Sequence, residues 1–256
     1  MDWPIYYSSI FILGLAVGSF VNSLVWRAQK KAKIKEARSI CPNCRVKIIW
    51  ADNIPLLSFV ILRRQCRHCG QKISWQYFLA EFFMGGVFLL SALLHSQNLV
   101  MPSLTFGLAR DLIILAFLAF IFLYDLNYME VLPSATIIPG AILLLISSAL
   151  NLQSVISALL GVVFGAGWFY FLFIVSRGRW IGGGDIMIGF FMGAILGWPL
   201  ILVAFFLSYM IGAVVSLFLM GFGQKTLKSR VPFGTFLVVG TVIAMFLGQR
   251  LLDLVF

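Results

Sequence analysis

Apolar residues occur in eight long stretches along this chain. Most of the stretches approach or exceed the roughly 18–20 residues that cross a bilayer as an α-helix. None alternates between polar and apolar positions as a membrane β-strand does, which excludes a membrane β-barrel. The pattern predicts an all-α polytopic membrane protein with about eight transmembrane helices. We expect these helices at residues 5–26, 76–95, 104–123, 134–150, 154–175, 185–198, 200–221 and 231–250.

Composition supports this fold class. The chain is 61% hydrophobic and only 11% charged, which is far more apolar than a soluble globular domain needs to be. The sixth stretch, 185–198, is short and rich in glycine. We therefore expect it to tilt, bend or lie partly sheltered by neighbouring helices.

The basic residues predict the orientation of the helices. Residues 27–75 contain 12 of the 19 lysines and arginines, and further basic residues follow the fifth and seventh stretches. With eight spans, these connections all lie on one face, which should be cytoplasmic because cytoplasmic loops are enriched in lysine and arginine. Topology and anionic lipid explain the net charge of +10. The charge gives no reason to expect nucleic acid as a partner.

All four cysteines lie in this basic connection, as two Cys-x-x-Cys pairs. Four thiolates can complete the tetrahedral shell of a structural zinc ion, and a reducing cytosol disfavours disulfides. A redox pair and unliganded thiols are the alternatives. We expect His68 to face solvent within the second pair, because four cysteines already suffice. The predicted metal ligands are Cys41, Cys44, Cys66 and Cys69.

These features predict three segments. Residues 1–26 form the first transmembrane helix, residues 27–75 form a cytoplasmic zinc-binding domain, and residues 76–256 form a membrane core of seven helices. The middle segment is too small to build a large apolar core, and a metal would compensate for this.

Two aspartates are predicted to lie at the same membrane edge. Asp125 ends the third span and Asp185 begins the sixth, so the topology places both on the cytoplasmic face. Two neighbouring carboxylates that share a proton can act as base and acid on a peptide bond. Three glycines, Gly182, Gly183 and Gly184, precede Asp185 and would let a peptide backbone approach it.

Glu81 is a third acid near this edge, about one turn inside the second span. An interhelical hydrogen bond is the favoured interpretation of Glu81, and support of the active site is the alternative. The aspartates themselves also allow a different function, in which a membrane transporter uses them to bind a cation or proton. The cysteine pairs could likewise belong to a docking protein. Transport predicts acids near the middle of the bilayer, whereas Asp125 and Asp185 are expected at its edge.

Several motifs together resemble the bacterial type IV prepilin peptidases, which are membrane aspartyl proteases. The resemblance extends over almost the whole chain. It rests on the paired cysteines, Glu81, Asp125, Gly182-x-Gly184-Asp185 and three further motifs. The further motifs are Gly18-Ser19-Phe20-Val21-Asn22, Asp52-Asn53-Ile54-Pro55-Leu56-Leu57-Ser58 and Val231-Pro232-Phe233-Gly234.

The resemblance implies an endopeptidase of the bacterial inner membrane with Asp125 and Asp185 as catalytic residues. Its substrates would be type IV prepilins or type II secretion pseudopilins, cleaved after a glycine at the cytoplasmic face to remove a short basic leader. The resemblance also implies a second activity, N-methylation of the new N-terminus with S-adenosylmethionine. Composition and spacing do not indicate this activity.

The chain departs from the family pattern at a few positions. Family members often carry lysine where this chain has Met187, and a proline where it has Thr235. Acids often found shortly after the first catalytic aspartate are here Asn127 and Ser134. These differences place the chain in a divergent branch and leave both aspartates intact.

Overall fold

The computed structural model describes residues 3–30, 40–41, 43–96, 102–222 and 231–255. Regular structure in these residues is helical, and two isolated β-bridges occur in place of strands. The predicted all-α class is therefore confirmed. Some basic residues used for the orientation, at 31–39 and 223–230, lie outside the described part of the chain.

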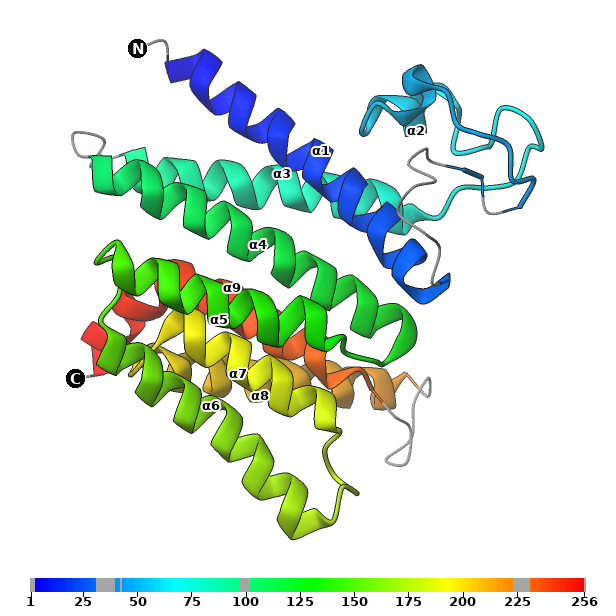
Figure 1. Cartoon of the computed structure of the whole chain (residues 1–256). Coiled ribbons are helices and arrows are strands. Elements are labelled where there is room, and N and C mark those ends of the chain that lie inside the picture. Colours follow the sequence, from blue (N-terminus) through cyan, green and yellow to red (C-terminus); the bar gives the residue numbers. More distant parts are fainter. Residues whose placement is uncertain (1–2, 31–39, 42, 97–101, 223–230, 256) are drawn as a thin grey trace. The chain divides into compact units, whose positions relative to one another are not determined.

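The chain divides into two compact units, Met1–Val100 and Met101–Phe256. Figure 1 shows the helices of both units in sequence colours. The first unit contains α1 (Trp3–Lys30), the 3-10 helix η1 (Trp50–Asn53), α2 (Leu57–Ile61) and α3 (Trp75–Ser96). The second contains α4 (Pro102–Tyr128), α5 (Pro133–Ala149), α6 (Val155–Ser176), α7 (Gly183–Leu196), α8 (Leu200–Gly221) and α9 (Phe233–Val255).

A helix corresponds to each of the eight predicted spans. Six of them, α1, α3, α4, α6, α8 and α9, are long and apolar enough to cross a membrane, while α5 and α7 are shorter apolar helices. Large apolar side chains such as Ile12, Val163 and Leu217 are exposed along the long helices. This exposure fits a protein whose outer surface contacts lipid rather than water.

In the first unit, α1 and α3 pack through glycines. A Cβ atom on Gly14 would lie 2.6 Å from the carbonyl oxygen of Met84, and one on Gly18 would lie 2.8 Å from the Cα atom of Glu81. Such distances are too short for any side chain, so glycine is required for this close crossing. Gly18 belongs to the first-span motif, and its position places that motif against the turn of α3 that carries Glu81.

In the second unit, α6 and α7 cross through two facing Gly-xxx-Gly motifs. Gly161 and Gly165 of α6 meet Gly193 and Gly189 of α7, with backbone against backbone. Small residues at this spacing let membrane helices approach closely. Because α7 begins at Gly183, this crossing also positions the start of α7, where Asp185 lies.

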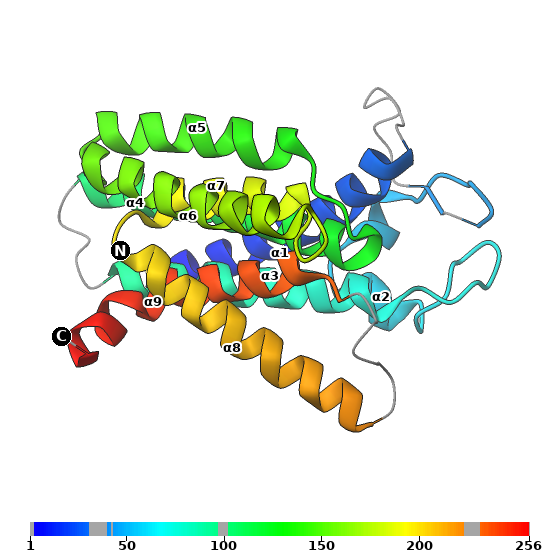
Figure 2. The ribbon, with the colours of Figure 1, turned by 90° about the horizontal axis from the view of Figure 1, so that it is seen from below.

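Helix α7 lies at the centre of the second unit. It contacts α5, α6, α8 and α9, and its side chains Ile188, Phe191 and Met192 are fully buried. In Figure 2, α8 runs obliquely beside its neighbour α9. The predicted sheltering of the short sixth stretch follows from this enclosure by protein.

The glycine crossing can be tested with a matched pair of substitutions on α6. Gly165→Ala adds a methyl group against the backbone of Gly189, whereas Gly167 has open space around it. Overpacking of this kind costs about 1–3 kcal/mol, so Gly165→Ala should lower the thermal unfolding midpoint of the purified protein. Gly167→Ala should leave the midpoint unchanged or raise it slightly. Equal midpoints for the two variants would contradict the crossing.

Candidate functional site

Asp125 lies in the last turn of α4 and is almost completely buried, with 5% of its surface exposed. Its carboxylate oxygen Oδ2 accepts a hydrogen bond of 2.9 Å from the backbone N–H of Thr235. Thr235 is the third residue of α9, so this N–H has no partner within its own helix. A buried carboxylate is costly without such a donor, and the start of α9 supplies it.

Asp185 is the third residue of α7. Its Oδ2 accepts a hydrogen bond of 3.2 Å from the backbone N–H of Gly182, the residue that caps the helix. Gly182 in turn accepts a bond from the N–H of Asp185 through its carbonyl oxygen. The start of α7 therefore holds the Asp185 carboxylate in the first turn, where the helix dipole favours negative charge.

The structure brings the two aspartates together. Gly234 lies between Asp125 and α7, because a Cβ atom on Gly234 would be 2.7 Å from both Asp125 Oδ2 and Ile188 Cδ1. Ile188 follows Asp185 by one helical turn. The two carboxylates are close enough for their charges to interact. The end of α4 and the starts of α7 and α9 thus form one acidic site.

The three glycines before Asp185 have different surroundings. A Cβ atom on Gly184 would lie 2.7 Å from Cγ2 of Val131, so this glycine accommodates the connection between α4 and α5. Gly183 has open space around it, and around Gly182 only the backbone nitrogen of Gly184 lies within 4 Å. The space predicted for a substrate backbone is therefore present beside Gly182 and Gly183 and is filled at Gly184.

Glu81 belongs to the first unit, on α3, and is buried. Its Oε2 accepts a hydrogen bond of 2.8 Å from the backbone N–H of Leu56, which precedes α2, and Ser19 of α1 also bonds to it. Leu56 has a positive φ of 61°. Glu81 thus fastens the start of α2 to both long helices of its unit, which fits the favoured interpretation of an interhelical hydrogen bond.

The two cysteine pairs adopt the same local structure. In each pair, the N–H of the first cysteine donates to the carbonyl five residues later, and the N–H four residues later donates back to that cysteine. The residue in this fourth position has a positive φ, of 57° at Arg45 and 68° at Gly70. The bonds are Cys41–Val46, Arg45–Cys41, Cys66–Gln71 and Gly70–Cys66, at 2.9–3.0 Å.

The four cysteine sulfurs converge on one point. All lie within 4.8 Å of one another, and Sγ of Cys41 is 3.9 Å from Sγ of Cys69. A tetrahedral zinc site with bonds of about 2.3 Å separates its sulfurs by roughly 3.8 Å. The backbone N–H of Gln71 and the amide of Asn43 lower the pKa of the Cys69 thiol to about 6, whereas burial and hydrogen bonds to the other sulfurs raise the pKa of Cys44 to about 11, so Cys69 is the thiol that favours the thiolate form. The arrangement can hold a metal ion, and His68 is exposed outside it.

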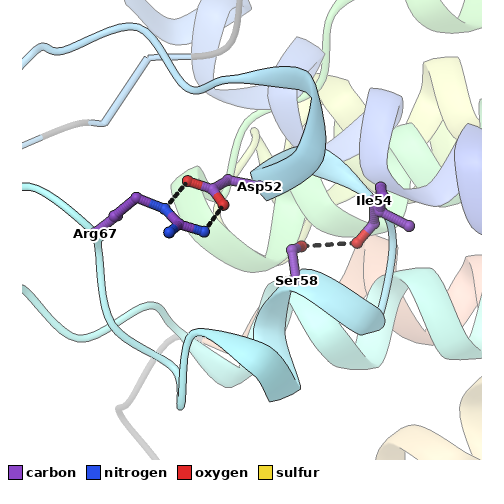
Figure 3. Close-up of polar contacts among 4 residues, drawn as sticks. All are labelled: Asp52, Ile54, Ser58 and Arg67. Atoms are coloured by element: carbon purple, nitrogen blue, oxygen red, sulfur yellow. Dashed lines mark hydrogen bonds and ion pairs between the residues drawn. The ribbon is translucent and has the colours of Figure 1, made fainter.

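An ion pair connects the second cysteine pair to η1. Arg67 donates to Asp52 from Nε at 2.8 Å and from a terminal nitrogen at 2.6 Å, as Figure 3 shows. These bonds hold the pKa of the Asp52 carboxyl below its usual value. The same figure shows Ser58 of α2 donating to the carbonyl of Ile54 at 2.7 Å. The segment between the cysteine pairs is therefore held by bonds at Asp52 and at Ser58.

A cavity of about 510 Å³ lies in the first unit, among α1, the cysteine pairs, α2 and the start of α3. Its size falls in the range of small-molecule sites. Three aromatic side chains, Trp26, Phe59 and Tyr77, line it together with the buried Glu81 and the ion-paired Asp52. The basic side chains Arg27, Lys47, Arg67 and Lys72 line it as well, so the walls combine apolar surfaces with groups of both charges.

Sequence reasoning missed the partners of the predicted acids. Thr235 and Gly234 contact Asp125 from 110 and 109 positions away, and Val131 fills the space at Gly184. The Val231–Gly234 motif indicated that the start of the last helix has a role, but a motif does not show that its partner is Asp125.

Two family models match the chain. Residues 12–95 match the bacterial peptidase A24 N-terminal domain, and residues 112–217 match the type IV leader peptidase family. The first match lies in the first unit, with the four cysteines and Glu81. The second match lies in the second unit and contains Asp125 and Asp185.

Curated proteins named prepilin leader peptidase/N-methyltransferase are similar to the chain. One from Myxococcus xanthus is 32% identical over 85% of this chain, and the match spans 64% of that relative. One from Bacillus subtilis is 28% identical over 96% of both chains. One from Klebsiella pneumoniae is 31% identical over 77% of this chain and 88% of its own length.

No solved structure matches the chain significantly. The family models cover both units, and the similarity to the relatives extends through most of the sequence. The chain therefore belongs to the type IV leader peptidase family.

Proposed function

We propose that this protein is an aspartyl endopeptidase that removes a short basic leader from type IV prepilins or type II secretion pseudopilins. The proximity of Asp125 and Asp185, each bonded to a helix start, carries the proposal. Two such carboxylates can supply the base and the acid that peptide hydrolysis requires. The names of the relatives support prepilins as the substrate class.

Hydrolysis uses one proton shared by the pair. The ionised carboxylate takes a proton from water, whose oxygen attacks the scissile carbonyl carbon, while the protonated carboxyl gives its proton to the carbonyl oxygen. The C–N bond then breaks as the amine receives the proton taken from water. The carbonyl oxygen re-forms its double bond and returns its proton to the second carboxyl, which restores the pair.

Cleavage takes place after a glycine, at the cytoplasmic face of the bacterial inner membrane. The basic residues of 27–75 support this orientation. The zinc-binding domain 27–75 lies on the cytoplasmic face, and residues 76–256 form the membrane core. Gly182 and Gly183 leave room for an extended peptide beside Asp185. Lipid and the pilin precursor are the partners of the protein.

The four cysteines hold a structural zinc ion. Four thiolates close the coordination shell and leave no position for substrate. The ion joins two short turns that have little apolar core of their own, so it stabilises the first unit.

The cavity of the first unit binds S-adenosylmethionine, the methyl donor for the new N-terminal amine. Its volume and its mixture of aromatic, acidic and basic side chains fit a ligand with an adenine ring, a cationic sulfonium and a carboxylate. Trp26, Phe59 and Tyr77 offer surfaces for the ring, and Glu81 favours the positive charge. When bound, this group supplies an activated methyl that the amine can take.

Substitution of either aspartate tests the peptidase. Asp125→Asn and Asp185→Asn should each lower cleavage of a prepilin by at least about a hundredfold, because one partner of the acid–base pair is lost. Leader removal is measured by mass spectrometry in a membrane assay, with the unfolding midpoint as a check on folding. Glu130→Gln, which changes an exposed acid beyond α4, is the control and should cleave normally. Full processing by either aspartate variant would refute the mechanism.

Metal analysis tests the zinc site. The purified protein should contain close to one zinc per chain, because the four sulfurs converge on one position. Cys66→Ser should lose most of the metal and His68→Ala should keep it, since the histidine lies outside the sulfur cluster. Protein purified without chelators that contains no zinc would contradict the assignment.

Direct binding tests the methyl-donor site. Tyr77→Ala should weaken binding of radiolabelled S-adenosylmethionine at least tenfold in equilibrium dialysis, and Tyr170→Ala, on an exposed surface of α6, should not. Pilin processed by the Tyr77→Ala variant should then be cleaved but unmethylated, as measured by mass spectrometry. Normal binding by Tyr77→Ala, or no binding by the wild type, would remove the cavity assignment and leave the peptidase untouched.

A further inference from the structure

The two aspartates differ in the backbone N–H groups that donate hydrogen bonds to them. Asp125 accepts the Thr235 N–H at 2.9 Å in a buried position, and the backbone of Gly234 contributes a second hydrogen bond. The bond to Asp185 recorded above is longer, at 3.2 Å, is exposed, and comes from the capping residue of its own helix. Asp125 therefore has the stronger set of donors.

From this difference we infer that Thr235 is a positioning residue, whose N–H makes Asp125 the ionised partner and hence the base that activates water. The inference rests on the proposed peptidase function. A backbone donor stabilises a carboxylate far more than a neutral carboxyl, most of all where water is excluded. The Thr235 bond engages Oδ2, and the carboxylate then accepts the proton from water. Asp185 then carries the shared proton.

The bond from Thr235 to Asp125 also requires that residue 234 has no side chain. Any Cβ atom there would collide with Asp125 Oδ2 and with Ile188. Glycine therefore lets the first turn of α9 approach the carboxylate, while the Thr235 hydroxyl donates to the Pro232 carbonyl at 2.7 Å and leaves the N–H free for Asp125.

Few other titratable groups in the described residues face the pair. Helix α5 carries none, and the ionisable residues of α9 lie at its opposite end. The titratable groups beside the pair are Asp185 on α7, Tyr209 on α8, which interacts with Asp185, and Tyr124 on α4 itself, which interacts with Tyr128 and Glu130. Arg177 and Arg179 precede α7, and among the described residues no cation pairs with either aspartate, so the donors at the start of α9 distinguish Asp125 from Asp185.

The N–H of Thr235 is not a feature that the family pattern requires. The resemblance described above includes relatives with proline at the position of Thr235, and proline has no N–H to donate. Proline in the first turn of a helix removes no bond within that helix. A Thr235→Pro variant should therefore fold and retain both aspartates, but lose this donor.

A matched pair of variants tests the inference through the pH profile of kcat/KM for prepilin cleavage. Thr235→Pro should move the acidic limb upward by about one to two pH units, because the Asp125 anion loses a charge-assisted bond. Thr235→Ala keeps the N–H and loses only the hydroxyl, so its acidic limb should lie at the same pH as that of the wild type. An unmoved acidic limb in Thr235→Pro, or a shift of the alkaline limb alone, would overturn the inference.

Infrared difference spectroscopy provides a second test that needs neither Thr235→Pro nor turnover. The protonated-carboxyl band should disappear at a lower pH in Asp185→Asn, where Asp125 is the remaining acid, than in Asp125→Asn, where Asp185 remains, because only Asp125 has the donors of α9. The reverse result would make Asp185 the base and overturn the inference. The inference about Thr235 can fail while the peptidase proposal stands. The peptidase proposal fails only if the aspartate variants still cleave prepilin.

Discussion

Backbone amides at the starts of two helices allow a pair of carboxylates to exist inside an apolar bundle. Asp125 is nearly inaccessible, and burying it without donors would cost several kcal/mol. Helix α9 begins beside it because Gly234 has no side chain to keep them apart, and Thr235 supplies the bond. Asp185 is held by the start of its own helix. The packing of the second unit and the chemistry of its acids therefore depend on the same few backbone contacts.

The short helix α7 gains its position from glycine rather than from length. Gly189 and Gly193 let it approach the backbone of α6, and its large side chains fill the core between the other helices of the unit. A helix enclosed in this way does not need to cross the bilayer, because its neighbours shield it from lipid. The packing of α7 from Ile188 onward fixes the direction of the helix whose first turn carries Asp185.

The first unit is organised by polar and metal-binding groups instead of a large core. Two turns of identical hydrogen bonding bring four sulfurs together, and an ion pair fastens Arg67 of the second turn to Asp52. Glu81 then bonds the segment after η1 to α3. These contacts enclose a cavity of about 510 Å³. Each unit thus has its own means of holding polar groups.

The sequence by itself determined the helical class, the eight apolar segments and the sulfur cluster, because apolar length and Cys-x-x-Cys spacing act over short distances. It also identified Asp125 and Asp185 as unusual acids, since charge is rare in apolar segments. Only the tertiary structure decided that Thr235 is the donor to Asp125, that Val131 fills the space at Gly184, and that the glycines of α6 and α7 face each other. Those contacts join residues far apart in the chain, and they depend on which helices become neighbours, a choice made by packing of the whole bundle.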